Sequence, residues 1–208
     1  WIASIKKTLA KAVEKGKATQ EDADAAFARI KATTDMKDFA DCDLVIEAVV
    51  EKMELKQKVF GDLDKICKPS TIFASNTSCL SVIDMAKSTG RKDKVIGMHF
   101  FNPVHIMKLM ELIRTIVNDD ATVEAVKAFG ESVGKTVIVV PDVPAFVVDQ
   151  LANPLILHAV TMVQNGVCDA KTLDTRVKLG LNHPMGPLEL ADPAGLATVL
   201  FLANALYA

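Results

Sequence analysis

Three short apolar runs, separated by helical patterns, constrain the fold of this 208-residue chain most strongly. The first run, residues 43–50 (DLVIEAVV), is β-branched and almost wholly apolar, as expected of a strand buried on both faces of a parallel sheet. Runs over 71–75 and 94–98 follow, and the segments between them, 52–67 and 80–87, have helical spacing. Strands that alternate with helices predict βαβ units with right-handed crossovers, and therefore a doubly wound sheet.

Further helices are expected on both sides of this alternation. Residues 4–15 form one, and Thr19 is a suitable N-cap for a second that ends near residue 31. The segment Pro141-Asp142-Val143-Pro144 is typical of a rigid linker, which predicts a sheet-containing domain over 1–141 and a helical domain over 142–208. The remaining expected elements are a helix over 122–133, a strand over 136–140, and helices over 145–165, 169–180 and 187–206.

Composition excludes several classes of function. The net charge of −2 argues against a nucleic-acid surface, and no run of eighteen apolar residues predicts a membrane span. The four cysteines are scattered without a CxxC pair, which favours reduced thiols over disulfides or a zinc site. We therefore expect a cytoplasmic protein, or one of the mitochondrial matrix if the source is eukaryotic.

The clearest indication of chemistry lies in residues 97–111 (GMHFFNPVHIMKLME). His99 stands at the end of an expected strand, Pro103 interrupts regular structure, and Glu111 lies within a second apolar run. An imidazole whose far nitrogen meets a carboxylate is suited to general base catalysis, because the carboxylate fixes the tautomer and stabilises the imidazolium. On spacing alone, a packed histidine and a solvated glutamate explain the pattern equally well.

Polar residues follow each of the three strands. Parallel strands would bring Glu51, Ser75–Ser78 and His99 to one edge of the sheet, where ligands bind in doubly wound folds. Without further support, Ser75–Ser78 is better explained as a strand-exit turn and helix cap. No GxGxxG turn occurs in the chain. A fold without a cofactor explains this, but we favour loss of the first βαβ unit, roughly sixty residues, because the chain starts at Trp1 and its first strand begins in mid-pattern.

Five motifs along the chain resemble the L-3-hydroxyacyl-CoA dehydrogenases, with the bacterial 3-hydroxybutyryl-CoA dehydrogenases among the most similar. These are DLVIEAVVE, SNTSCLS, VIGMHFFNPVHIMKLME, GKTVIVVPDVPAFV and NHPMGPLELAD, in the order of the family. The resemblance implies a Rossmann-type NAD-binding domain that lacks its N-terminal part and a helical domain that lacks its C-terminal part. It also implies NAD as cofactor, with NADP left open, an acyl-CoA substrate, and a homodimer formed through the helical domain.

The resemblance assigns roles to individual residues. His99 matches the general base and Glu111 the carboxylate that orients it. Ser78 matches the serine that contacts the substrate beside the cofactor, and Asn102 matches an asparagine next to the nicotinamide. Glu51 and Lys56 match a pair that meets the cofactor. Lysines of the first helix would face the CoA phosphates, although a solvated helix face explains them better: Lys6, Lys7 and Lys11.

The chain departs from the family at the start of the helical domain. Asp149 stands where the family has an active-site asparagine, and an ionised aspartate accepts hydrogen bonds but donates none. Near His99, its charge would also favour the imidazolium and weaken the base. Asn153, one helical turn further on, would substitute in part. Asp149 and the missing glycine-rich turn keep open a non-catalytic protein that binds CoA thioesters. A related hydroxyacid dehydrogenase of the L-gulonate or crystallin type also stays open, because it shares the HFFNPV segment, although NHPMGPLELAD fits the acyl-CoA enzymes better.

Other groups of residues are expected to serve structure. Glu47, inside an apolar strand, is expected to be a paired structural carboxylate. Three methionines around the predicted site, Met98, Met107 and Met110, are expected in the core. Residues 199–202 are four consecutive apolar positions, which a monomer surface would rarely tolerate, and they support the expected dimer.

Overall fold

The computed structural model describes residues 2–207, and internal contacts divide the chain into one unit up to Ala40 and a second from Asp41 onward. The first unit is a helical hairpin of α1 (Ile2–Glu14) and α2 (Gln20–Ala28), followed by the short 3-10 helix η1 (Met36–Phe39). Thr19 caps α2 as predicted: its hydroxyl accepts a hydrogen bond from the Asp22 amide, and the Asp22 carboxylate accepts one from the Thr19 amide.

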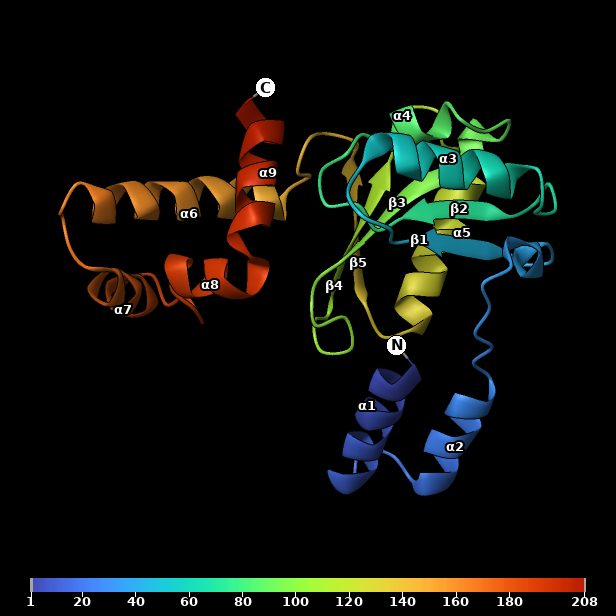
Figure 1. Ribbon diagram of the computed structural model, residues 1–208, viewed down its shortest axis with the longest axis horizontal. Coiled ribbons are helices and arrows are strands. Elements are labelled where there is room, and N and C mark those ends of the chain that lie inside the picture. Colours follow the sequence, from blue (N-terminus) through green and yellow to red (C-terminus); the bar gives the residue numbers. More distant parts are fainter. Residues whose placement is uncertain (1, 208) are drawn as a thin grey trace. The chain divides into compact units, whose positions relative to one another are not determined.

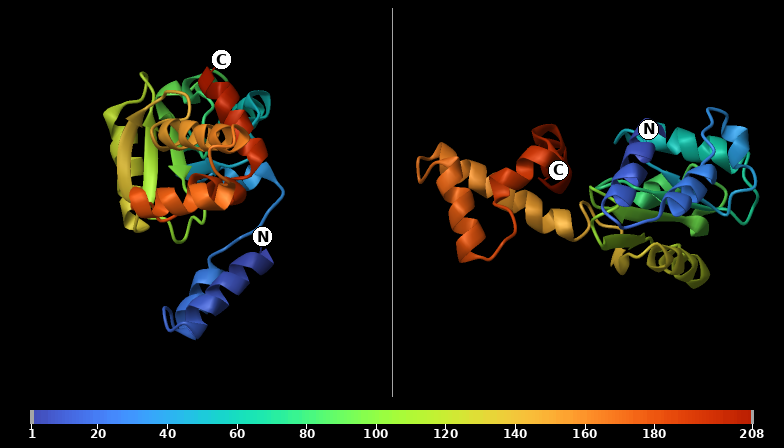
Figure 2. Two further views of the ribbon diagram at one scale, coloured as in Figure 1. Left: turned by 90° about the vertical axis from the view of Figure 1, so that its left-hand side faces the viewer. Right: turned by 90° about the horizontal axis from the view of Figure 1, so that it is seen from below.

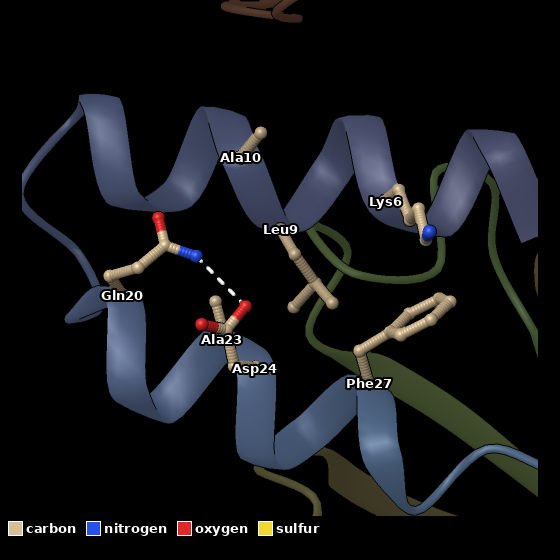
Figure 3. Close-up of a pocket in the computed structure, with 7 residues that line it drawn as sticks. All are labelled: Lys6, Leu9, Ala10, Gln20, Ala23, Asp24 and Phe27. Carbon is tan, nitrogen blue, oxygen red and sulfur yellow. Dashed lines mark hydrogen bonds between the residues drawn. The ribbon is translucent and has the colours of Figure 1, made fainter.

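A shallow hollow lies between the two helices of the hairpin (Figure 3). The Lys6 ammonium lies over the Phe27 ring, 4.7 Å from its centroid, and Gln20 donates a hydrogen bond to Asp24 across one turn of α2. Lys6, Lys7 and Lys11 are all exposed, as expected of a solvated helix face. Their predicted contact with CoA phosphates stays a prediction.

The second unit is built on a five-stranded sheet of order β1-β2-β3-β4-β5 (Figure 1). All neighbouring strands are parallel except β3 and β4, which are antiparallel. Helices α3 and α4 lie on one face of the sheet and α5 on the other, which is the doubly wound arrangement that the sequence predicts (Figures 1 and 2). The elements are β1 (Leu44–Glu47), α3 (Met53–Asp64), β2 (Ile72–Ser75), α4 (Val82–Ala86), η2 (Lys92–Lys94), β3 (Val95–Phe100), β4 (Leu109–Arg114), α5 (Asp120–Ser132) and β5 (Thr136–Pro141).

The two faces of the sheet bury different side chains, because successive residues of a strand point to opposite sides. Under α5 lies an apolar core that includes Met98 and Met110, both fully buried as predicted. The face under α3 and α4 carries polar groups among its apolar ones. Here Gly97 is required for close packing, since a Cβ at this position would come within 2.7 Å of the Ile113 side chain.

Two predictions about burial are wrong. The first strand is not buried on both faces: Ile46 is 39% exposed, because β1 lies at the edge of the sheet, whereas α5 packs on β4 and β5. Met107 is 41% exposed, because it lies in the loop between β3 and β4 rather than in the core.

The remaining chain is helical, with α6 (Val148–Gln164), α7 (Ala170–Gly180), α8 (Pro187–Ala194) and α9 (Leu196–Tyr207). The single helix predicted over 187–206 is wrong, because Gly195 adopts a φ of +83° and breaks it into two. Helix α6 starts three residues later than predicted, since Ala145 and Phe146 also have positive φ. The predicted domain boundary between residues 141 and 142 falls within the second unit and stays a prediction.

No single helix in residues 2–207 has the length and apolar character to cross a membrane. Helices α8 and α9 reach that length and apolar character only when they are taken together, and the chain bends by 102° at their junction.

Candidate active site

The antiparallel pairing of β3 and β4 brings His99 and Glu111 together. These residues are direct register partners, so their side chains share a face of the sheet. His99 Nδ1 lies 2.9 Å from Glu111 Oε2, and the two residues are only 5% and 2% exposed. The alternative of a packed histidine and a solvated glutamate is therefore wrong for the glutamate, which is buried and paired.

This hydrogen bond selects the tautomer of His99. A carboxylate only accepts hydrogen bonds, so Nδ1 carries the proton and Nε2 keeps its lone pair. Nε2 lies 3.3 Å from the hydroxyl oxygen of Ser78, in the loop after β2. The rings of Phe101 and Phe146 flank the imidazole, with centroids 4.6 and 5.6 Å from its own. His99 is thus oriented with its basic nitrogen toward a polar group between two aromatic rings.

The second oxygen of Glu111 meets the start of α6. Oε1 accepts hydrogen bonds from the amides of Val147 and Val148, at 3.3 and 3.1 Å. Val147 stands at the N-cap and offers no side-chain acceptor, so Glu111 replaces the missing cap from 36 residues away and interacts favourably with the helix dipole. This role was not predicted from the sequence. Its only signal is a helix start without Ser, Thr, Asp or Asn at the cap.

Asp149 lies in the first turn of α6, close to this pair. Burial raises the pKa of its carboxyl above the usual value; the charge of His99 opposes the shift and that of Glu111 adds to it. The same carboxylate contributes to the environment of Cys79, a buried thiol whose pKa is raised to about 12, mainly by burial. Cys79 is therefore a neutral, unreactive thiol beside the site.

Asn153 is buried one turn further along α6, at 2% exposure. Its amide nitrogen donates to the Val199 carbonyl oxygen of α9 at 2.9 Å, while its Oδ1 atom has no hydrogen-bond partner. One of the two N–H donors that were expected to replace the family's asparagine is thus used within the protein. A substrate contact of Asn153 stays a prediction.

The predicted cofactor pair belongs to a buried ionic network under α3. Lys56, 1% exposed, places its ammonium 2.8 Å from Glu47 Oε1 and 3.1 Å from Glu51 Oε2, and it also donates to the Val49 carbonyl oxygen. Ser75 donates to Glu47 at 2.7 Å. Glu47 is therefore a paired structural carboxylate, as predicted. All three protons of Lys56 have acceptors, so its predicted cofactor contact, if made, would act through Glu51.

Glu51 joins this network to the loop that carries Ser78. Its Oε1 accepts a hydrogen bond from the Ser78 amide at 3.1 Å and another from the Thr77 hydroxyl. Asn102 is exposed in the loop after β3. Asn76, which the sequence analysis did not single out, accepts a hydrogen bond from the Phe100 amide at 2.9 Å and so ties the end of β3 to the loop after β2.

The structure thus brings together His99, Glu111, Ser78 and Asp149, and it links Glu51 to Ser78. No group of three or more His, Cys, Asp or Glu side chains in the described part of the chain could hold a metal ion. The arrangement can take up a proton at Nε2 of His99 beside a hydroxyl donor, at the edge of the sheet where doubly wound folds bind ligands.

Comparison with known proteins gives one consistent result. Residues 1–143 match the NAD binding domain of 3-hydroxyacyl-CoA dehydrogenase, and residues 146–208 match its C-terminal domain. A 3-hydroxybutyryl-CoA dehydrogenase of Bradyrhizobium diazoefficiens is 46% identical over 99% of this chain and 70% of its own length, and one of Clostridioides difficile is 44% identical over 99% and 73%. The crystal structure of (S)-3-hydroxybutyryl-CoA dehydrogenase from Ralstonia eutropha is 42% identical, with a TM-score of 0.95 over 99% of this chain and 73% of that one. The chain therefore belongs to the 3-hydroxyacyl-CoA dehydrogenase family.

Proposed function

We propose that this protein oxidises (S)-3-hydroxyacyl-CoA to 3-oxoacyl-CoA with NAD, or catalyses the reverse reduction, and that 3-hydroxybutyryl-CoA is its substrate. The observation that carries the proposal is the buried His99–Glu111 pair, whose free Nε2 faces Ser78 at the ligand-binding edge of the sheet. Relatives at 44–46% identity carry the name of this activity. They support the acyl-CoA class over the hydroxyacid alternatives.

The residues of the chain account for the proton in this reaction. During oxidation, His99 Nε2 accepts the proton of the 3-hydroxyl group while the C3–H bond breaks and the C3–O bond becomes a carbonyl. Glu111 holds the ring and stabilises the imidazolium that forms. The Ser78 hydroxyl, 3.3 Å from Nε2, is placed to hold the same substrate oxygen. In the reverse direction, the imidazolium returns the proton to the oxygen.

The donor set at this edge fits one part of NAD. When bound, NAD accepts the hydride from C3 of the substrate. Glu51, whose side chain is 28% exposed, Ser78 and Asn102 offer acceptors and donors to the ribose and the nicotinamide amide, beside His99. Lys56 keeps Glu51 in place through its ion pair. The 208 residues contain no GxGxxG turn, so no residue here is assigned to the pyrophosphate.

The direct test is His99→Ala, assayed with NAD and (S)-3-hydroxybutyryl-CoA. Loss of a general base should lower kcat by roughly 10²- to 10⁴-fold, with a much smaller effect on acyl-CoA binding. His158→Ala, which removes an exposed imidazole of α6 at a hollow lined by α7 and the start of α8, is the control and should retain activity. Turnover of His99→Ala at the rate of the unmodified protein would contradict the assignment. Tight acyl-CoA binding without turnover in the unmodified protein would instead favour the non-catalytic alternative.

We also propose a homodimer formed through the helical region. Large apolar side chains are exposed along these helices, which a monomer would leave in water. Light scattering at micromolar concentration should give twice the monomer mass, and Leu200→Glu should lower it; a monomer in both cases would refute the proposal. The exposed side chains include Leu151 at 74%, Leu179 at 83%, Leu196 at 68%, Leu200 at 62% and Tyr207 at 71%.

A cytoplasmic location stays a prediction.

A further inference from the structure

Asp142, in the linker after β5, makes a contact that the proposed mechanism does not use. Its two carboxylate oxygens accept hydrogen bonds from the amides of Val82 at 3.0 Å and Ile83 at 2.8 Å, which open helix α4. Its own amide donates to the Arg114 carbonyl oxygen at the end of β4. Asp142 therefore joins three segments that are far apart in the sequence: its side chain binds the start of α4, and its backbone amide binds the end of β4. Charge-assisted hydrogen bonds of this kind are stronger and more directional than neutral ones.

The two segments that the Asp142 side chain joins each contribute a residue beside His99. On one side, Val82 lies four residues after Ser78, whose hydroxyl faces Nε2. On the other side, Asp142 lies four residues before Phe146, whose ring flanks the imidazole. The same linker delivers the amides of Val147 and Val148, to which Glu111 is bonded.

Between Asp142 and α6, the linker forms a tight turn with little conformational freedom. The Phe146 amide donates to the Val143 carbonyl oxygen at 3.1 Å, and Ala145 and Phe146 have φ values of +57° and +48°, which L side chains rarely adopt. Both residues are fully or almost fully buried, and Ala145 packs against Cys79, the neighbour of Ser78. A displacement at Asp142 is therefore transmitted to Phe146 and to the start of α6 rather than absorbed by the turn.

We infer that Asp142 is a positioning residue: it clamps the linker to the start of α4 and so holds Ser78, His99 and the Glu111-capped end of α6 in register for proton transfer. The inference rests on the proposed function for its catalytic consequence, because it takes His99 as the base. The clamp itself is a statement about structure and is measured separately.

The first measurement is hydrogen exchange at backbone amides, which needs no substrate. Asp142→Asn keeps the shape of the side chain but offers one acceptor and turns an NH₂ group toward a second N–H donor. It should accelerate exchange at Val82 and Ile83 and also at Val147 and Val148, which Asp142 does not touch. Asp84→Asn is the matched control: it removes a carboxylate of α4 that pairs with exposed Lys87, and it should leave Val147 and Val148 unchanged.

The second measurement is steady-state kinetics well below the unfolding temperature. Misplacing groups around a base should lower kcat by about tenfold or more in Asp142→Asn while KM for the acyl-CoA changes by less than about threefold. Asp142→Glu, which restores two acceptors, should recover most of kcat. A residue that only stabilises the fold would lower the unfolding temperature and leave kcat per folded molecule intact. If Asp142→Asn does not fold, Asp142→Ser, with a single oxygen acceptor, is measured with the same expectation.

The outcomes separate the inference from the proposed function. Unchanged exchange at Val147 and Val148 overturns the clamp, whatever the activity. If the unmodified protein has no dehydrogenase activity, the proposed function is wrong. The hydrogen-exchange measurement still tests whether Asp142 holds the linker against α4. If His99→Ala is inactive but Asp142→Asn turns over like Asp84→Asn, then the proposed function stands and the positioning role is wrong.

Discussion

Two buried ionisable clusters lie on the same face of the sheet, and they differ in how completely their charges are paired. In the first, Lys56 has three acceptors and lies between Glu47 and Glu51. In the second, His99 is paired with Glu111, while Asp149 stands beside both with a raised pKa. In the first cluster the charge of Lys56 is fully paired, and only the Glu51 carboxylate, 28% exposed, reaches the surface. The second leaves one imidazole nitrogen and one carboxyl group available to a ligand.

The comparison teaches that burial alone does not distinguish a structural cluster from a reactive one. Lys56 and Glu111 are equally inaccessible, at 1% and 2% exposure. What differs is the number of unfilled donor and acceptor positions. Burying charge is tolerated when every group is satisfied. Unfilled hydrogen-bonding positions beside a titratable group are typical of a functional site.

The largest expected effect comes from breaking the first cluster. Lys56→Met would leave Glu47 buried without its counter-ion, which should lower the free energy of unfolding by about 3–5 kcal/mol. Urea denaturation measures it. Lys58→Met is the matched control on the same helix: Lys58 pairs with Asp62 at the surface, with its side chain 72% exposed, so its loss should cost less than about 1 kcal/mol.

The double variant Glu47→Gln, Lys56→Met distinguishes the cause. Removing both charges should restore much of the lost stability, because no unpaired buried ion remains. A double variant as unstable as Lys56→Met would mean that packing of the lysine stem, and not the charge of Glu47, is responsible.

Asp149→Asn tests the second cluster through its activity. The change removes a negative charge beside His99 and supplies a donor, so kcat/KM should rise and the acidic limb of the pH–rate profile should move to lower pH. We expect kcat/KM to rise by about threefold or more, because removing a neighbouring charge changes the interaction energy at His99 by an amount that corresponds to such a factor. A rise of this size would exceed ordinary variation between preparations. Lower activity with an unmoved profile would show that the family assignment fails at this position.

The same variant makes a separate prediction about stability. Because the pKa of Asp149 is raised in the folded protein, the folded state binds more protons than the unfolded chain, and stability falls as pH rises from the ordinary value of 3.8. Asp149→Asn removes this loss. It should therefore be more stable than the unmodified protein at neutral pH, and the difference should shrink as the pH is lowered from neutral toward 3.8. Thermal unfolding across this range measures it; a constant difference would show that Asp149 does not titrate abnormally.

The smallest expected effect concerns Asn153, whose Oδ1 atom is buried without a partner. Asn153→Leu removes this cost at the expense of the hydrogen bond to Val199, so a net gain of about 1 kcal/mol in unfolding free energy is expected. If the variant instead loses stability and raises KM for the acyl-CoA, then Asn153 contacts the substrate, as its position one helical turn after Asp149 predicts.

Much of the fold could be predicted because its information is local. Apolar patterns located four of the five strands and most helices, whereas β4 was recognised only as an apolar run, and turn residues such as Thr19 marked a helix start that the structure confirms. The errors arise where neighbours in space decide. Ile46 is exposed because β1 lies at an edge, and Gly195 divides a helix whose apolar pattern runs through it.

The sequence by itself identified the family and the residues that we propose for the chemistry, because His99, Glu111 and Ser78 stand in the family's motifs. Only the tertiary structure decided how they work together. The antiparallel register of β3 and β4 sets His99 opposite Glu111, and the fold directs the other oxygen of that carboxylate to α6 and Asp142 to α4. The physical reason is range. Helix and strand periods arise within about ten residues, whereas these hydrogen bonds join residues 12 to 60 positions apart, and no local pattern encodes which distant partner is near.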